Sequence, residues 1–196
     1  MRFVGDVHGW WDEYVHVIKE TEFSIQVGDF GMGFKGLDYQ ALNGLPLGHR
    51  FLRGNHDSPE RCKADPHWIP DGEYYRGVFC VGGGFSRDWA FRTEGKSWWR
   101  DEELSVSEME RIFDIYVKDK PKYVASHECP AEFLEMFRYP EVQVSSTGKF
   151  LQSLLEAHRP ELWVFGHHHS TMHRNFGSTE AICLGELSHI DIDLEV

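Results

Sequence analysis

The stretch ELWVFGHHHS, residues 161–170, places three consecutive histidines directly after an apolar run. A purification tag is excluded because tags lie at chain termini, whereas this run follows a segment typical of a buried strand. If the strand ends at Phe165, side chains two positions apart share one face of the turn that follows. His167 and His169 are then expected to point together, and His168 is expected to point elsewhere. A histidine-rich surface loop is the alternative, and residues elsewhere in the chain decide between the two.

The composition of the chain is that of a single globular domain, expected to span residues 1–196. Hydrophobic residues make up 41% of it and the mean hydropathy is -0.46. No run approaches the ~20 apolar residues that a transmembrane helix requires, so no membrane partner is expected. The net charge of -12 argues against a nucleic-acid partner, although bound cations would make a site locally positive.

Cysteine spacing and the start of the chain bear on location. The four cysteines lie far apart and form no CxxC pair, which argues against a zinc knuckle and a disulfide framework. The chain begins MRFVGDVHG, without a charged and then apolar leader. These features predict a reducing, cytoplasmic location.

Short apolar runs alternate with amphipathic stretches, as expected of an α/β or α+β layered domain. Helical periodicity predicts helices around residues 11–18, 109–117 and 150–155. A capping-box pattern from Ser107 to Glu110 is expected to begin the second helix. The predicted strands lie at residues 2–5, 23–28, 50–54, 77–83, 122–126, 161–166, 181–185 and 190–194.

Polar side chains follow these strands at five places. The residues are Asp6 and His8, Asp29, Asn55 and His56, His127, and His167 and His169. Carboxylate, amide and imidazole groups form a ligand set that suits manganese, iron, zinc, cobalt or nickel. The sequence therefore predicts a metal site.

The spacing of these residues has a physical reason. Asp6 and His8 are two positions apart at a strand end, so both can contact one ion while Val7 turns into the core. A carboxylate such as Asp29 has two oxygens and can bridge two cations held ~3.5–4 Å apart. Two divalent ions side by side are therefore expected.

The order DxH, GD, GNHD, a single His and GHxH, from residue 6 to residue 169, resembles the motif set of the calcineurin-like metallophosphoesterases. The small phage and bacterial members are the most similar type. The resemblance implies a four-layer αββα sandwich with its site at the carboxyl ends of the strands. It also implies hydrolysis of phosphomonoesters or small phosphodiesters, such as nucleotides or cyclic nucleotides, by a metal-bound hydroxide. Manganese is the first expectation for the metal.

The same resemblance assigns roles to individual residues. It places one ion among Asp6, His8, Asp29 and His169, and a second among Asp29, Asn55, His127 and His167. His56 would lie beside the leaving oxygen as a general acid or an orienting donor. Asp57 either holds that imidazole or is an exposed helix cap.

Arg53 is similar to the phosphate-binding arginine of the serine/threonine protein phosphatases, and a guanidinium can donate two hydrogen bonds to a phosphoryl group. Those phosphatases carry an Asp-Arg pair soon after GD, where this chain has FGMGF at residues 30–34. Protein phosphatase activity is therefore not expected. A strand-end arginine paired with carboxylates is the alternative for Arg53.

The segment of residues 82–105 combines glycines, arginines and tryptophans. Arg87, Arg92 and Trp98 are candidates for contacting a nucleotide or aryl phosphate by charge and stacking. Tryptophans that pack under the domain are the alternative.

Two other functions fit the same motifs. A metal-dependent nuclease would normally show a basic track, which this acidic chain lacks. A non-catalytic protein-interaction scaffold would not need His56 and the complete ligand set. The small-molecule phosphoesterase is therefore the preferred hypothesis.

Overall fold

Two β-sheets form the centre of the computed structural model, which describes residues 1–33, 42, 44–137 and 144–195. In spatial order, the first sheet contains β10 (His189–Asp191), β1 (Arg2–Val4), β2 (Ser24–Gln26) and β3 (His49–Phe51). The second contains β4 (Glu73–Tyr75), β5 (Val78–Val81), β6 (Tyr123–Ser126), β7 (Leu162–Phe165), β9 (Thr179–Cys183) and β8 (Met172–Phe176). Strands β10, β4 and β8 are antiparallel to their neighbours, and the other strands pair in parallel.

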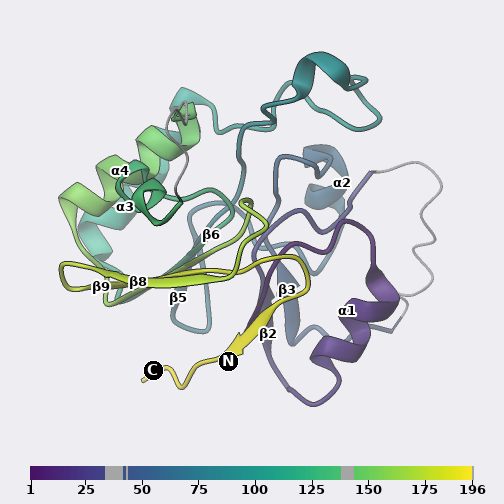
Figure 1. Ribbon diagram of the computed structural model, residues 1–196, viewed down its shortest axis with the longest axis horizontal. Helices are drawn as coiled ribbons and strands as arrows, with labels where there is room; N and C mark the ends of the chain where they lie inside the picture. Colours follow the sequence, from purple (N-terminus) through teal and green to yellow (C-terminus); the bar gives the residue numbers. More distant parts are fainter. Residues whose placement is uncertain (34–41, 43, 138–143, 196) are drawn as a thin grey trace.

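Helices cover the outer faces of the two sheets (Figure 1). On the first sheet lie α1 (Trp11–Ile18) and α2 (Pro59–Ala64), and on the second lie α3 (Val106–Asp119) and α4 (Ser146–Ala157). Two short 3-10 helices, η2 (Trp89–Phe91) and η3 (Ala131–Met136), lie in the connections. The fold class is therefore the expected αββα sandwich.

The alternation of side chains along β5 explains this layering. Val78 and Cys80 belong to the apolar cluster between the sheets, whereas Phe79 and Val81 belong to the cluster beneath α3 and α4. All four side chains are buried because the second sheet is covered on both faces. A third cluster buries α1 against β1 and β3.

The structure corrects the expected start of the second helix. The capping box of α3 lies two residues earlier, where Ser105 Oγ accepts a hydrogen bond from the Glu108 amide and Glu108 accepts one from the Ser105 amide. The pattern Ser-x-x-Glu occurs at both positions, and the earlier one forms the cap because the chain is already helical at Val106.

Each predicted strand region overlaps an observed strand, but the sequence pattern did not predict β4 and β8. Both are edge strands, and three of the five β8 side chains are exposed. Such strands need no apolar alternation, so they lack the signal. Among the described helices, none has the length and apolar character needed to cross a membrane.

Candidate metal centre

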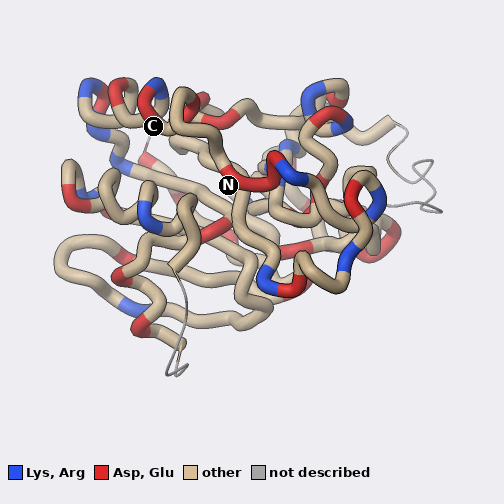
Figure 2. The backbone as a smooth tube through the Cα atoms, turned by 90° about the horizontal axis from the view of Figure 1, so that it is seen from above, with Lys and Arg blue, Asp and Glu red and all other residues tan. Residues whose placement is uncertain are grey.

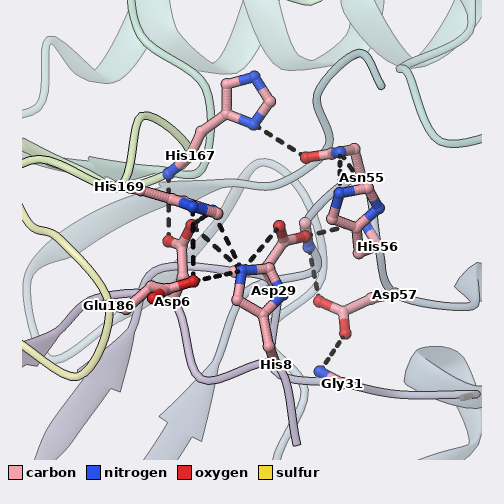
Figure 3. Close-up of polar contacts among 12 residues, drawn as sticks. Asp6, His8, Asp29, Gly31, Asn55, His56, Asp57, His167, His169 and Glu186 are labelled. Carbon is pink, nitrogen blue, oxygen red and sulfur yellow. Dashed lines mark hydrogen bonds and ion pairs between the residues drawn. The ribbon is translucent and has the colours of Figure 1, made fainter. Parts of the chain in front are cut away.

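The predicted metal ligands meet where loops from both sheets come together (Figure 3). Loops after β1, β2 and β3 contribute from the first sheet, and loops after β6 and β7 from the second. All seven expected ligands lie there: Asp6, His8, Asp29, Asn55, His127, His167 and His169.

The first group consists of Asp6, His8, Asp29 and His169, which offer ligand atoms that all lie within 4.8 Å of one another. His169 Nε2 is 3.2 Å from Asp6 Oδ2 and 3.1 Å from His8 Nε2. His8 Nε2 is 3.8 Å from Asp29 Oδ2. These nitrogen and oxygen atoms converge on one small space.

The second group is built around the amide oxygen of Asn55. His127 Nε2 lies 2.8 Å from Asn55 Oδ1, and His167 Nδ1 lies 2.9 Å from the same atom. Asn55 Nδ2 donates to Ser86 Oγ at 3.0 Å, and Ser86 in turn donates to Glu102 at 2.6 Å. This chain of hydrogen bonds orients the amide so that its oxygen faces both imidazoles.

Asp29 joins the two groups. Its Oδ2 faces His8, whereas its Oδ1 is 3.5 Å from His127 Nε2. Burial raises the pKa of Asp29 well above its ordinary value, and the negative charges of Asp6 and Asp57 raise it further. A cation between these groups would stabilise the ionised carboxylate.

The donor set fits divalent cations. Asp6 Oδ2 is buried, and no described donor reaches it in hydrogen-bond geometry. Asp6 and Asp29 are fully buried carboxylates whose ion-pair contacts, within the described residues, are all with histidines. Buried charges are normally paired or coordinated to metals. Carboxylate and imidazole groups that face one another across such a small space form a ligand set that divalent metals accept.

A family model described as calcineurin-like phosphoesterase matches residues 2–171. The chain belongs to this family. It is a phosphoesterase hydrolase, and the family uses divalent metal ions.

This phosphoesterase shares its fold with several solved structures of low sequence identity. It matches TT1561 of Thermus thermophilus with a TM-score of 0.59 at 14% identity, covering 95% of this chain and 89% of that one. A putative 5'-nucleotidase from Staphylococcus aureus matches with a TM-score of 0.58 at 15% identity, covering 98% of this chain and 50% of that one. The phosphopantetheinyl hydrolase of Mycobacterium tuberculosis matches with a TM-score of 0.54 at 12% identity, covering 94% and 89%. None of the curated proteins matches the sequence significantly.

The three consecutive histidines of the phosphoesterase point in different directions. His167 faces Asn55 and His169 faces Asp6, whereas His168 Nε2 lies 3.2 Å from a Glu128 oxygen. The directions agree with the prediction, but the reason differs. His167 and His169 adopt left-handed backbone angles, with φ of 66° and 49°, so they do not continue an extended strand.

His56 lines a cavity of about 300 Å³, together with Asp29 and Asn55. Burial and then the positive charge of Arg92 lower the pKa of His56 to about 3. The ring is therefore neutral near pH 7 and can donate a hydrogen bond from one nitrogen.

The segment predicted to contact substrate is divided by the structure. Arg87 and Arg92 line the cavity of His56, and Arg92 donates to Asp88 at 2.6 Å. Trp98 lies outside it and packs near Trp89, with ring centroids 5.7 Å apart, beside a neighbouring cavity of about 500 Å³. Arg92 lines both cavities.

The structure corrects the phosphate-binding role expected for Arg53. Its guanidinium is buried, donates to Asp71 at 2.8 Å, and donates to the carbonyl oxygens of Glu102 and Asp101 at 2.8 and 3.2 Å. It does not line the cavity. Arg53 instead ties the end of the 82–105 segment to the domain, which is the carboxylate-pairing alternative.

Asp57 takes neither of its two expected roles. It is fully buried and accepts hydrogen bonds from the amides of Phe30, Gly31, Met32 and Gly54 at 2.7–3.0 Å. The cap of α2 is the next residue along the chain. The hydrogen bonds of Asp57 thus connect the loop after β2, which carries Asp29, with the loop after β3, which carries Asn55.

Replacing Asp57 with Asn is expected to lower the free energy of unfolding by about 2–4 kcal/mol, because an amide replaces one of two oxygens that each accept two backbone hydrogen bonds. Urea denaturation of the metal-free protein, followed by tryptophan fluorescence, measures this loss. Asp114→Asn at an exposed position of α3 is the matched control and should change stability by less than about 0.5 kcal/mol. Equal stability of both variants would contradict the role of Asp57.

Sequence reasoning missed four polar residues near the centre: Ser86, Glu102, Glu128 and Glu186. Glu128 and Glu186 follow β6 and β9, so the strand-end signal that found the other residues could have found them. Ser86 and Glu102 lie in a long connection and carry no such signal.

Proposed function

We propose that this phosphoesterase, as one domain of residues 1–196, hydrolyses small phosphoesters at a centre of two divalent ions. The observation that carries the proposal is that the two oxygens of Asp29 face two separate groups of nitrogen and oxygen atoms. Asp6, His8, Asp29 and His169 would hold one ion, and Asp29, Asn55, His127 and His167 the other. Manganese remains the first expectation, with iron, zinc, nickel and cobalt as alternatives.

When bound, two such ions supply Lewis acidity to a phosphoryl oxygen and lower the pKa of water. The protein residues orient the substrate and handle the leaving group. Arg87 and Arg92 border the cavity and can attract the phosphoryl charge. The neutral ring of His56 can donate its hydrogen toward the leaving oxygen.

The volume of the cavity beside His56 and the distribution of charged residues favour a small substrate such as a nucleotide or cyclic nucleotide. The cavity of about 300 Å³ is at the lower end of small-molecule sites. Along the described backbone, Lys and Arg positions are interspersed with Asp and Glu positions (Figure 2). These features support a small phosphoester over long nucleic acid.

The test is turnover of a chromogenic phosphoester with each candidate metal, with elemental analysis of the same samples. Metal-dependent turnover with two ions per chain supports the proposal. A protein that binds two ions and turns over no phosphoester in a panel of nucleotides, cyclic nucleotides and phosphoproteins would be a scaffold instead.

Salt dependence separates the small-substrate enzyme from a nuclease. Raising salt from about 50 to 200 mM is expected to change kcat/KM for a nucleotide-sized substrate by less than about 3-fold, because few phosphate contacts form. A protein that contacts 6–10 phosphates of long DNA loses ~10³–10⁵-fold in affinity over the same range. Rapid cleavage of a plasmid, with a steep salt slope, would favour the nuclease.

The cytoplasmic location stays a prediction. Cys62, Cys80, Cys129 and Cys183 are all free and buried, which is consistent with it.

A further inference from the structure

Glu128 is a buried carboxylate in contact with two of the three consecutive histidines. Its Oε2 lies 3.4 Å from His167 Nε2, and its Oε1 lies 3.2 Å from His168 Nε2. The side chain is nearly inaccessible to solvent. Glu128 therefore faces the outer edge of an imidazole whose inner edge faces Asn55.

The two imidazoles beside Asn55 are arranged alike but use opposite nitrogens. His127 Nδ1 lies 2.9 Å from the carbonyl oxygen of Val27, and its Nε2 faces Asn55. Because a carbonyl only accepts, the hydrogen of His127 lies on Nδ1 and its lone pair points inward from Nε2. His167 has the reverse orientation, with Nδ1 inward and Nε2 outward.

His167 needs an acceptor at Nε2 for the same reason. An imidazole can offer a lone pair at Nδ1 only if its hydrogen is on Nε2. The Asn55 oxygen would favour the opposite tautomer in the metal-free protein, because it accepts a hydrogen from Nδ1. The carboxylate of Glu128 opposes this preference.

Other contacts hold Glu128 in place. Its Oε1 accepts a hydrogen bond from the Cys129 amide at 2.9 Å, and its Oε2 accepts one from Ser145 Oγ at 3.2 Å. His168 adds a third contact, and its ring packs against Phe137 with centroids 4.3 Å apart. The carboxylate therefore cannot turn away from His167 without losing several contacts.

We propose that Glu128 is a positioning residue that keeps the hydrogen of His167 on Nε2, so that Nδ1 is free to bind the second ion. His168 serves the same task indirectly, because it helps to hold Glu128. The statement about the second ion rests on the proposed function, whereas the statement about the His167 tautomer does not.

Nitrogen NMR of the histidine side chains in the metal-free protein tests the tautomer directly. The wild type should show His167 protonated at Nε2. Glu128→Ala should shift the hydrogen to Nδ1. Glu128→Gln should keep it on Nε2, because the amide oxygen of glutamine can accept a hydrogen bond from that nitrogen. Asp71→Asn, at a buried carboxylate beside Arg53, is the control for a general loss of stability and should leave the His167 signals unchanged.

Titration with Co²⁺, followed by visible absorption, tests the consequence for the metal. Glu128→Ala should weaken binding of the second ion by about 10–100-fold, with the first ion little affected, and Glu128→Gln should restore most of that affinity. Wild-type affinity for the second ion in Glu128→Ala would overturn the positioning role, as would an unchanged His167 tautomer in that variant. If Glu128→Ala does not fold, Glu128→Gln decides. The positioning role is overturned if this variant binds the second ion with wild-type affinity while its His167 is protonated at Nδ1.

The number of bound ions distinguishes failure of the proposed function from failure of the positioning role. If the wild type binds no second ion, the proposed function fails while the tautomer result still decides what Glu128 does to His167. Glu128, Cys129 and His168 are also close enough to hold a cation themselves. In that case the wild type would bind three ions, and Glu128→Ala would lose the third ion while its His167 tautomer stayed unchanged. This result would overturn the positioning role.

Discussion

Asp29→Asn is expected to lower occupancy of both metal sites and to reduce phosphoesterase activity by more than about 100-fold, because ligand losses exceed those of outer-shell partners. The reason is that Asp29 faces the first group with Oδ2 and the second group with Oδ1. Asparagine replaces one of these oxygens with an amide NH₂, which carries no lone pair for a cation. Elemental analysis after dialysis, together with turnover of a nitrophenyl phosphoester, measures both effects.

Asp114→Asn removes the same charge from an exposed position of α3 and should retain full occupancy. Loss of one ion alone in Asp29→Asn would assign Asp29 to a single site. Full occupancy of both sites would remove the carboxylate from the centre and with it the main support for the proposed function.

His56→Asn is expected to keep both ions and to lose ~10²–10⁴-fold in rate on an alkyl phosphoester, with a smaller loss on a nitrophenyl one. Metal binding should survive because the contact between this residue and Asp29 is made by the His56 backbone amide, at 2.8 Å from Asp29 Oδ1. Hydrogen donation to a leaving oxygen matters more as that oxygen becomes more basic, which explains the dependence on the leaving group.

Parallel assays of both substrates with metal analysis of each sample check this prediction. Equal rate losses on both substrates, with metals retained, would mean that His56 orients the phosphoryl group rather than assisting the leaving oxygen. Loss of metal would place His56 among the ligands, and the role of Asn55 would need to be reassigned.

The fold class and the residues gathered at the centre could be predicted from the sequence. The αββα order follows from apolar runs that are buried on both faces, as in β5. The gathering of Asp6, Asp29 and Asn55 follows because parallel neighbouring strands end at the same edge of a sheet. Each of these features depends on residue type and on position relative to a strand, which a sequence displays directly.

The roles of Arg53 and Asp57 could not be predicted in this way. Both follow a strand within one short motif, and both have side chains that could have reached the cavity. Arg53 turns to Asp71, and Asp57 turns to four backbone amides. Most of their hydrogen-bond partners come from segments distant in the chain, so the local sequence does not show which groups these two side chains contact.

The sequence by itself determined the layered fold, the order of the strand-end motifs and the chemical types of the candidate ligands. Only the tertiary structure decided the direction of each side chain. His8, Asp29, His167 and His169 have positive φ angles, a conformation that costs non-glycine residues about 1–3 kcal/mol each and that packing must hold. A Cβ at Gly166 would lie 2.3 Å from Asp6 Oδ1, so this turn depends on a residue 160 positions away in the chain. The partner of each imidazole nitrogen, Val27 for His127 and Glu128 for His167, is likewise set by long-range packing, because no local rule selects between the two nitrogens of a histidine ring.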